Sequence, residues 1–551
     1  MKHIFVLLIL LSVSGGCLSN VYYVANNQSG ASDSNNGAVD TPWLTVQHAV
    51  DQVTAGDTIY VREGMYNEYI TISRSGSRDA PITLCGYENE DVVLDGSDLE
   101  WRYGIDIGGS DYWTIENLKV QDYIREGLRG NGFVSWGGSE GITLRNLDFT
   151  LVGTPVKFHE GGKDILIEDI RATNYTDGAF DCGPAGPCDG LVIRRFFASG
   201  PGQGNDTAVD GFAVEEGKNV LIEDCISENH PGDGFDFKSD STVLRRVIAR
   251  NNTRNNIKLW GTGSRVENSL SYDCGLTNLV LAEGGSYQIV NCTFANRTSY
   301  GYLVTIGFDE ALETPVQIFN TIFYNDNPEM GGTLIYFGAG VALTADYNIY
   351  YNPFRETDVI CAAFIDQCFN KEHIADGTWF QESVCGEHSQ YADPLFMNTS
   401  SGDFHLQSIS PAVNAGQFNE SLTTDLDGLP RLSGSATDIG CYEYQEATPV
   451  LNQKAIFNSR SDRLLTNYPN PFNQTTVIHY TVRSEGPAHL FIRDVRGREI
   501  RQLFKENIPA GTHSVFWRGD DDTGRYLPSG LYFICLEING FIQVGKLLLL
   551  R

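Results

Sequence analysis

The chain has 551 residues, of which 41% are hydrophobic, and a formal net charge of −31. This length is enough for two or three domains, and the negative charge makes double-stranded nucleic acid and anionic membranes poor partners. The 58 glycines and 26 tyrosines, together with many Asn and Asp, favour an all-β protein rich in turns. An acidic polysaccharide would need a local basic patch or a bound cation to bind such a chain.

Residues 1–20 have the pattern of an export signal peptide. An apolar run, residues 4–13, follows a lysine and precedes small residues. The run is too short to span a membrane, and we find no other candidate span. We therefore expect a secreted protein, in which disulfides can form. Sequence does not fix their connectivity, but two short spacings suggest candidate pairs: Cys182–Cys188 and Cys361–Cys368.

Residues 21–445 contain a repeat of short strands. Four segments follow one another every 22 or 23 residues: "VLIEDCISENH" (220–230), "TVLRRVIARNN" (242–252), "SRVENSLSYDC" (264–274) and "YQIVNCTFANR" (287–297). A second set runs in phase: "DGFAV" (210–214), "DGFDF" (233–237), "NNIKL" (255–259) and "TNLVL" (277–281). Such a period with Gly, Asn and Asp turns indicates a solenoid. Because helix signals are nearly absent, we expect a parallel β-helix.

The two ends of this solenoid need caps, since an open coil exposes its core. We expect a helix within residues 41–61, with Thr41 as its N-cap and Pro42 at its first position. Its apolar stripe would be Leu44, Ala49, Val50 and Val53. The opening of the chain, and "ADPLF" to "DIGCYEY" (392–444), resemble the first and last coils of bacterial right-handed β-helix proteins.

The C-terminal part is predicted to be a separate domain. Residues 446–462 are polar and suggest a linker, and alternating strands in residues 463–551 suggest a small β-sandwich. The motifs "NYPNPF", "DVRGRE" and "SGLYF", with a basic and apolar tail, resemble the sorting domain of type IX secretion cargo. This resemblance implies a Gram-negative bacterium, the type IX secretion machinery as a partner, and a protein that is released or held at the outer cell surface.

Residues at equivalent positions of the repeat should form columns, because neighbouring strands lie about 4.8 Å apart. If Phe235 and Phe237 point into the core, Asp236 points outward, and Lys258 does so one coil later. The first outward column is Ala213, Asp236, Lys258 and Val280. The second is Glu215, Lys238, Trp260 and Ala282. At the preceding turn the column is Asp210, Asp233, Asn255 and Thr277, with Asp177 as a further candidate.

The columns leave two interpretations open. Stacked carboxylates of Asp210, Asp233 and Asp236 would repel one another, and a Ca²⁺ ion, which takes six to eight oxygen ligands, would relieve this repulsion. Alternatively, the aspartates accept backbone N–H bonds in turns, and Asp236 forms a surface ion pair with Lys258 worth less than about 1 kcal/mol.

The stretches "GDGFDF" (232–237) and "NNIKLW" (255–260) resemble motifs of polysaccharide lyase family 9, the β-helical pectate lyases. The resemblance implies that three aspartates bind calcium: Asp210, Asp233 and Asp236. It also implies that Lys258 is the catalytic base. The chain departs from the family at Gly232, where the motif has its first Asp, and in the short spacing between the Asp motif and the lysine.

We therefore expect a lyase that cleaves an acidic, pectate-like polysaccharide by calcium-assisted β-elimination. This reaction removes a weakly acidic proton, so it needs charge neutralisation at the uronate and a base. Candidate substrate-binding residues are Trp260, Arg254 and Lys238. We expect a monomer.

Three other functions are compatible with the same fold. A glycoside hydrolase would need two carboxylates about 5 to 9.5 Å apart, and an epimerase would also act on the uronate. The candidates for such a pair are Asp177, Asp181, Asp210 and Glu215. The third possibility is a non-catalytic surface binder or adhesin. The surroundings of Lys258 distinguish these functions.

Overall fold

The computed structural model describes residues 19–445 and 465–549, apart from short gaps. The gaps are residues 89, 100–102, 126–127, 184, 201–208, 283, 298–301, 308–312, 331–332, 469–471, 473–474, 483–485, 495–497, 509–510 and 539–540. Residues 1–18 of the predicted signal peptide and the predicted linker therefore lie outside the described residues. No helix among the residues described is long and apolar enough to cross a membrane.

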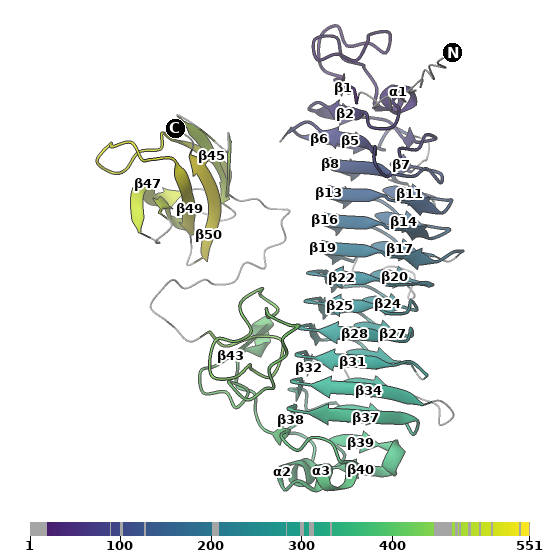
Figure 1. The fold of residues 1–551 in the computed structure, drawn as a ribbon, viewed down its shortest axis with the longest axis vertical. Coiled ribbons are helices and arrows are strands. Elements are labelled where there is room, and N and C mark those ends of the chain that lie inside the picture. The colour runs from purple at the N-terminus through teal and green to yellow at the C-terminus, as the bar shows by residue number, and fades with distance from the viewer. Residues whose placement is uncertain are drawn as a thin grey trace, which may run out of the picture. The chain divides into compact units, whose positions relative to one another are not determined.

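The first compact unit is a right-handed parallel β-helix, as predicted, whose coils are stacked in Figure 1. Among the described residues, a 22-stranded and a 13-stranded sheet run along it, and a 4-stranded sheet accompanies some of the coils. The 22-stranded sheet includes strands from β1 (Val21–Val24) to β41 (Gln390–Tyr391). The 4-stranded sheet consists of β12 (Ser139–Glu140), β15 (Gly162–Lys163), β18 (Cys188–Asp189) and β21 (Gly217–Lys218).

The 13-stranded sheet carries the predicted columns. Its order is β4 (Ile70–Thr71), β7 (Ile105–Asp106), β11 (Phe133–Ser135), β14 (Val156–Phe158), β17 (Phe180–Cys182), β20 (Phe212–Val214), β24 (Phe235–Phe237), β27 (Ile257–Leu259), β30 (Leu279–Leu281), β33 (Val304–Ile306), β36 (Ile335–Phe337), β39 (Ile360–Ala362) and β40 (Gln367–Phe369). All neighbours up to β39 pair in parallel, and β40 is antiparallel.

Alternation of side chains fixes the register of this sheet. Phe235 and Phe237 are fully buried in the core, and the rings of Phe212 and Phe235 stack at 5.0 Å. The outward residues of neighbouring strands pair as predicted: Ala213 lies beside Asp236, and Asp236 lies beside Lys258. A shift by one residue would place these charges in the core, so the apolar positions determine which polar side chains share the outer face.

An alternating charge ladder lies on the 22-stranded sheet. It runs over β8 (Trp113–Gln121), β13 (Thr143–Thr150), β16 (Leu166–Thr173), β19 (Val192–Ser199), β22 (Leu221–Glu223), β25 (Val243–Arg245) and β28 (Ser264–Glu267). Its members, in register, are Glu116, Arg145, Glu168, Arg194, Glu223, Arg245 and Glu267. Successive members form ion pairs of 2.9 to 3.7 Å. Each carboxylate of the ladder therefore has a guanidinium neighbour.

The N-terminal helix begins later than predicted. α1 spans Val46–Gln52, and its N-cap is Thr45. The carboxylate of Asp33 accepts hydrogen bonds from the backbone N–H groups of Leu44 and Thr45. These bonds hold the chain outside the helix up to Thr45, so Thr41 and Pro42 precede it. Leu44 is exposed, and the other residues of the predicted stripe are buried: Ala49, Val50 and Val53.

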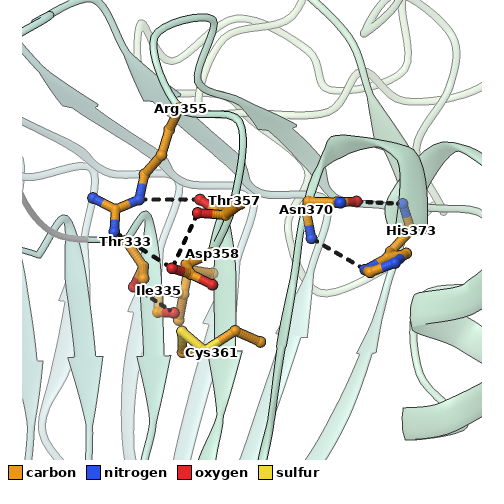
Figure 2. The surroundings of a disulfide bond; sticks show 9 residues. Thr333, Ile335, Arg355, Thr357, Asp358, Cys361, Asn370 and His373 are labelled. Carbon is orange, nitrogen blue, oxygen red and sulfur yellow. Dashed lines mark hydrogen bonds and ion pairs between the residues drawn. A yellow bond between two sulfur atoms is a disulfide. The ribbon is translucent and has the colours of Figure 1, made fainter.

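Both candidate disulfides are present. Cys182 pairs with Cys188, and Cys361 pairs with Cys368 across β39 and β40. Figure 2 shows the second bond close to Asp358 and to the capping box that begins α2 (Lys371–Ala375). In this box the side chains of Asn370 and His373 each accept a backbone N–H of the other residue. The next helix, α3, spans Thr378–Ser383.

Residues 395–414, 418–438 and 442–551 form the second compact unit. Its first part contains the hairpin of β42 (Phe396–Asn398) and β43 (Asp403–Leu406). Its last part is the expected small β-sandwich. One antiparallel sheet is β44 (Leu465–Tyr468), β45 (Thr476–Val482) and β48 (Gly511–Trp517). The other is β47 (Glu499–Ile508), β46 (Gly486–Arg493), β49 (Gly530–Ile538) and β50 (Phe541–Leu549). Ile478, Trp517, Leu490 and Leu536 contribute to one core from both sheets.

Candidate active site

Three aspartates from neighbouring coils converge on the outer face of the 13-stranded sheet. Asp236 is the middle residue of β24, Asp233 lies in the turn before that strand, and Asp210 lies before β20. One carboxylate oxygen from each lies within 4.8 Å of the others. Asp177, the further candidate, is not in this group. The pairing of Phe180 with Phe212 explains this, because it brings Gly178 rather than Asp177 opposite Asp210.

The turns position two of the carboxylates through backbone N–H groups. Oδ1 of Asp210 accepts the backbone N–H of Asp233 at 2.7 Å. Oδ1 of Asp233 accepts the backbone N–H and the side-chain amide of Asn255, both at 2.9 Å. These bonds match the turn role that the sequence left open for the aspartates. They also orient the carboxylates, which a metal site requires.

Lys258 faces two of the three aspartates. Its Nζ lies 3.4 Å from Oδ2 of Asp233 and 3.3 Å from Oδ2 of Asp236. The lysine side chain is 18% exposed, whereas Asp233 and Asp236 are nearly buried. Unlike the ladder on the 22-stranded sheet, this cluster has three carboxylates against one ammonium. Lys258 therefore cannot balance the cluster alone.

Burial makes the charge of this cluster costly. Burial, with the charges of Asp233 and Asp236, raises the pKa of the Asp210 carboxyl to about 7, although the backbone hydrogen bond from Asp233 opposes this shift. Burial also raises the pKa of Asp236, although the positive charge of Lys258 opposes this shift. An oxygen-only donor set with excess negative charge fits a hard divalent cation such as Ca²⁺. The three aspartates are thus suitable ligands.

Trp260 contacts both Lys258, the candidate base, and Asp236, a candidate metal ligand. Its indole Nε1 donates a hydrogen bond to Oδ1 of Asp236 at 3.1 Å, and Nζ of Lys258 lies 5.0 Å from the centre of its ring. The side chain is nevertheless 46% exposed. Trp260 remains a candidate sugar-binding residue, and it also orients Asp236. The sequence did not indicate this second role, because both contacts depend on side-chain rotamers.

The other predicted binding residues lie near the cluster but outside it. Lys238 is exposed and forms an ion pair with Glu215. Arg254 is exposed in the turn before β27, where its backbone N–H bonds to the carbonyl of Gly232. Asp181, one of the hydrolase candidates, pairs with Lys157 at 2.6 Å. Because Asp181 and Glu215 each have a lysine partner, neither is a free carboxylate facing the other.

Gly232 has no room for the aspartate that the pectate lyase motif has at this position. A Cβ at this position would lie 2.4 Å from Oδ1 of Asp210 and 2.6 Å from the carbonyl oxygen of Val209. The second contact is with backbone and cannot be relieved by a rotamer change. The missing carboxylate is therefore part of how this turn packs against the preceding coil.

Gly232→Asp should destabilise the protein instead of completing the site. Overpacking at a site of this kind costs about 1 to 3 kcal/mol, and thermal unfolding would measure the loss. The matched control is Gly138→Asp, since the nearest atom to a Cβ at Gly138 is 3.5 Å away. A Gly232→Asp variant with unchanged melting temperature and tighter calcium binding would contradict the packing argument.

A second aromatic group lies on the same sheet. The ring of Trp136 is 5.4 Å from that of Tyr103 and 5.2 Å from that of His159. Trp136 and His159 follow β11 and β14 directly. The signal was available in the sequence, because "FVSW" and "VKFH" have the same spacing as "IKLW", the segment that contains Lys258 and Trp260.

Comparison with known proteins finds the same type of β-helix. Residues 22–269 match the family model described as a Pel9A-like, right handed beta helix region. This stretch is similar to pectate lyase Pel9A. It includes the three aspartates, Lys258 and Trp260. Residues 204–354 also match a general right handed beta helix region.

Individual relatives differ in how much of the chain they cover. Pectate lyase PEL9 of Emericella nidulans is 47% identical over 245 residues, which is 40% of this chain and 51% of that protein. The chain thus spans about half the length of this curated relative. The uncharacterized protein YwoF of Bacillus subtilis is 24% identical over 451 residues, 71% of this chain and 91% of its own. The crystal structure of pectate lyase Pel9A is 16% identical, with a TM-score of 0.45 over 78% of this chain and 98% of that chain.

Proposed function

We propose that this protein is a secreted polysaccharide lyase that cleaves a uronate-containing, pectate-like polymer by calcium-assisted β-elimination. The observation that carries the proposal is the position of Lys258, whose amine faces the aspartate cluster on the outer face of the sheet. The similarity of residues 22–269 to a pectate lyase-like family supports it.

In the proposed mechanism, Asp210, Asp233 and Asp236 hold the cation. Bound calcium would neutralise the substrate carboxylate and stabilise the charge that develops beside it. Nζ of Lys258, as the neutral amine, accepts the proton alpha to that carboxylate. The electron pair of the broken C–H bond forms the new C=C bond, the bond to the glycosidic oxygen breaks, and that oxygen takes a proton from water. The hydroxide formed takes the proton from Lys258 and restores its neutral amine. Trp260 keeps Asp236 in position through its indole N–H.

The test is the ultraviolet absorbance of the unsaturated product. The full chain would be incubated with polygalacturonate, and then with alginate, in calcium and in chelator. We expect a calcium-dependent increase on at least one uronate polymer. If no polymer gives an increase while the protein is folded, the lyase proposal fails.

One observation favours a second candidate, a non-catalytic carbohydrate-binding surface protein. The contacts of Lys258 with Asp233 and Asp236 are also those of a structural ion pair. A binder of this kind would be retained by the polymer but would release neither unsaturated products nor new reducing ends. A rise in reducing ends without the absorbance would instead indicate a hydrolase.

We further propose that residues 1–20 direct export and that residues 463–551 are read by the type IX secretion machinery, which would place the protein outside the cell or on its surface. The β-sandwich of the second unit is compatible with a sorting domain. Deleting residues 463–551 in a bacterium that has this machinery should leave the protein in the periplasm, as measured by fractionation. Unchanged release of the truncated protein would contradict the proposal.

A further inference from the structure

Three rings lie close together at the N-terminal end of the face that carries the candidate active site. Tyr103, Trp136 and His159, here called the aromatic platform, form a row in which neighbouring rings are 5.4 and 5.2 Å apart. Trp136 is 36% exposed. The neighbouring rings meet edge to face, at interplanar angles of 61° and 64°, so they form a stepped row. The exposed part of Trp136 offers an apolar surface with a polar edge.

The register places the platform and the active site on one face. Val134 pairs with Lys157, and Lys157 with Asp181. The same column continues through Ala213 to Asp236 and then to Lys258. Trp136, His159 and Trp260 each stand two residues after a member of this column. Trp136 and His159 therefore repeat the position of Trp260 in earlier coils, whereas Tyr103 precedes β7.

The distance between the platform and Lys258 suits a long ligand that lies along the solenoid. From β14 to β27 the sheet order has four steps, which correspond to about 19 Å at the usual strand spacing. A polysaccharide advances by a comparable distance per pyranose residue as the sheet does per strand. A chain bound at Lys258 and directed along the sheet would reach the platform within a few sugar residues.

We propose that the aromatic platform is a remote subsite that stacks a pyranose ring of the same polyuronate chain that is held at Lys258. The proposal rests on the proposed function in that it takes the occupant of this face to be a uronate polymer. Stacking on ring faces does not require a charged partner, which suits a position where Lys157 is already paired with Asp181 at 2.6 Å.

The experiment measures binding without cleavage. The full chain carrying Lys258→Ala is run by affinity electrophoresis through gels with increasing polygalacturonate, in calcium. Adding Trp136→Ala should weaken the affinity about tenfold, and His159→Ala should weaken it in the same direction. Trp136→Phe keeps a ring and should retain most of the affinity. The matched control is Phe418→Ala, which removes an aromatic side chain that is 48% exposed in the second unit.

Each outcome decides the proposal. Equal affinity of the Trp136→Ala and Phe418→Ala proteins, both with unchanged melting temperature, would overturn the platform, as would a parent protein that polygalacturonate does not retard. If the native protein forms product but binding does not depend on Trp136, the lyase proposal is supported and the subsite proposal is contradicted. If binding depends on Trp136 but the native protein forms no product, the subsite proposal is supported and the lyase proposal is contradicted.

Discussion

Lys258→Arg should lose nearly all formation of unsaturated product, and Lys258→Ala should behave in the same way. Arginine keeps the positive charge beside Asp233 and Asp236, but it remains protonated and cannot accept a proton. Loss of a general base lowers the rate by about 10²- to 10⁴-fold. Product absorbance measured at saturating polymer would give this factor. The arginine variant therefore separates a catalytic base from a structural ion pair, which alanine alone cannot do.

The control for this series is Lys163→Ala. Lys163 also lies in a strand and pairs with a carboxylate, that of Glu140 at 3.5 Å, but it belongs to the 4-stranded sheet. Its loss should leave the rate unchanged. A Lys258→Arg protein with native activity would show that the lysine supplies only charge, and the assignment of the base would be wrong.

The sequence predicted the columns because two independent patterns agree. The period of 22 or 23 residues sets which strands are neighbours, and alternation of apolar residues sets which side chains face outward. The sequence therefore predicts that Asp236 pairs with Lys258, and the structure has them in register. The candidate disulfides were found for a similar local reason, since six or seven residues separate each pair.

The remaining features depend on contacts that a repeat does not encode. Asp177 misses the cluster because the register across the insertion differs by one residue from the expected one. Gly232 was recognised as a departure from the family motif, but its packing against Val209 required the backbone geometry. The N-cap of α1 was displaced by Asp33, a residue outside the predicted helix.

Calcium should stabilise the native protein, and Asp236→Asn should remove most of this effect. A ligand present at a hundred times its dissociation constant adds about 2.7 kcal/mol to the free energy of unfolding. Asparagine retains an acceptor for the indole N–H of Trp260 but loses one of three charges. We expect the affinity for calcium to fall at least about tenfold, since carboxylate count sets the strength of such sites. Melting temperature against calcium concentration measures both quantities without any substrate.

Asp240→Asn is the matched control for this measurement. Asp240 follows β24 closely but is exposed, and its Oδ1 accepts the backbone N–H of Thr262 at 2.9 Å, a bond that asparagine can keep. This variant should respond to calcium like the native protein. If Asp236→Asn also kept the full response, the cation would bind elsewhere, and the aspartate cluster would not be the calcium site. Asp236→Asn should lose product formation at low calcium and regain part of it at high calcium, because a higher calcium concentration offsets weaker binding. Calcium should not restore product formation in Lys258→Arg, because that variant lacks the base.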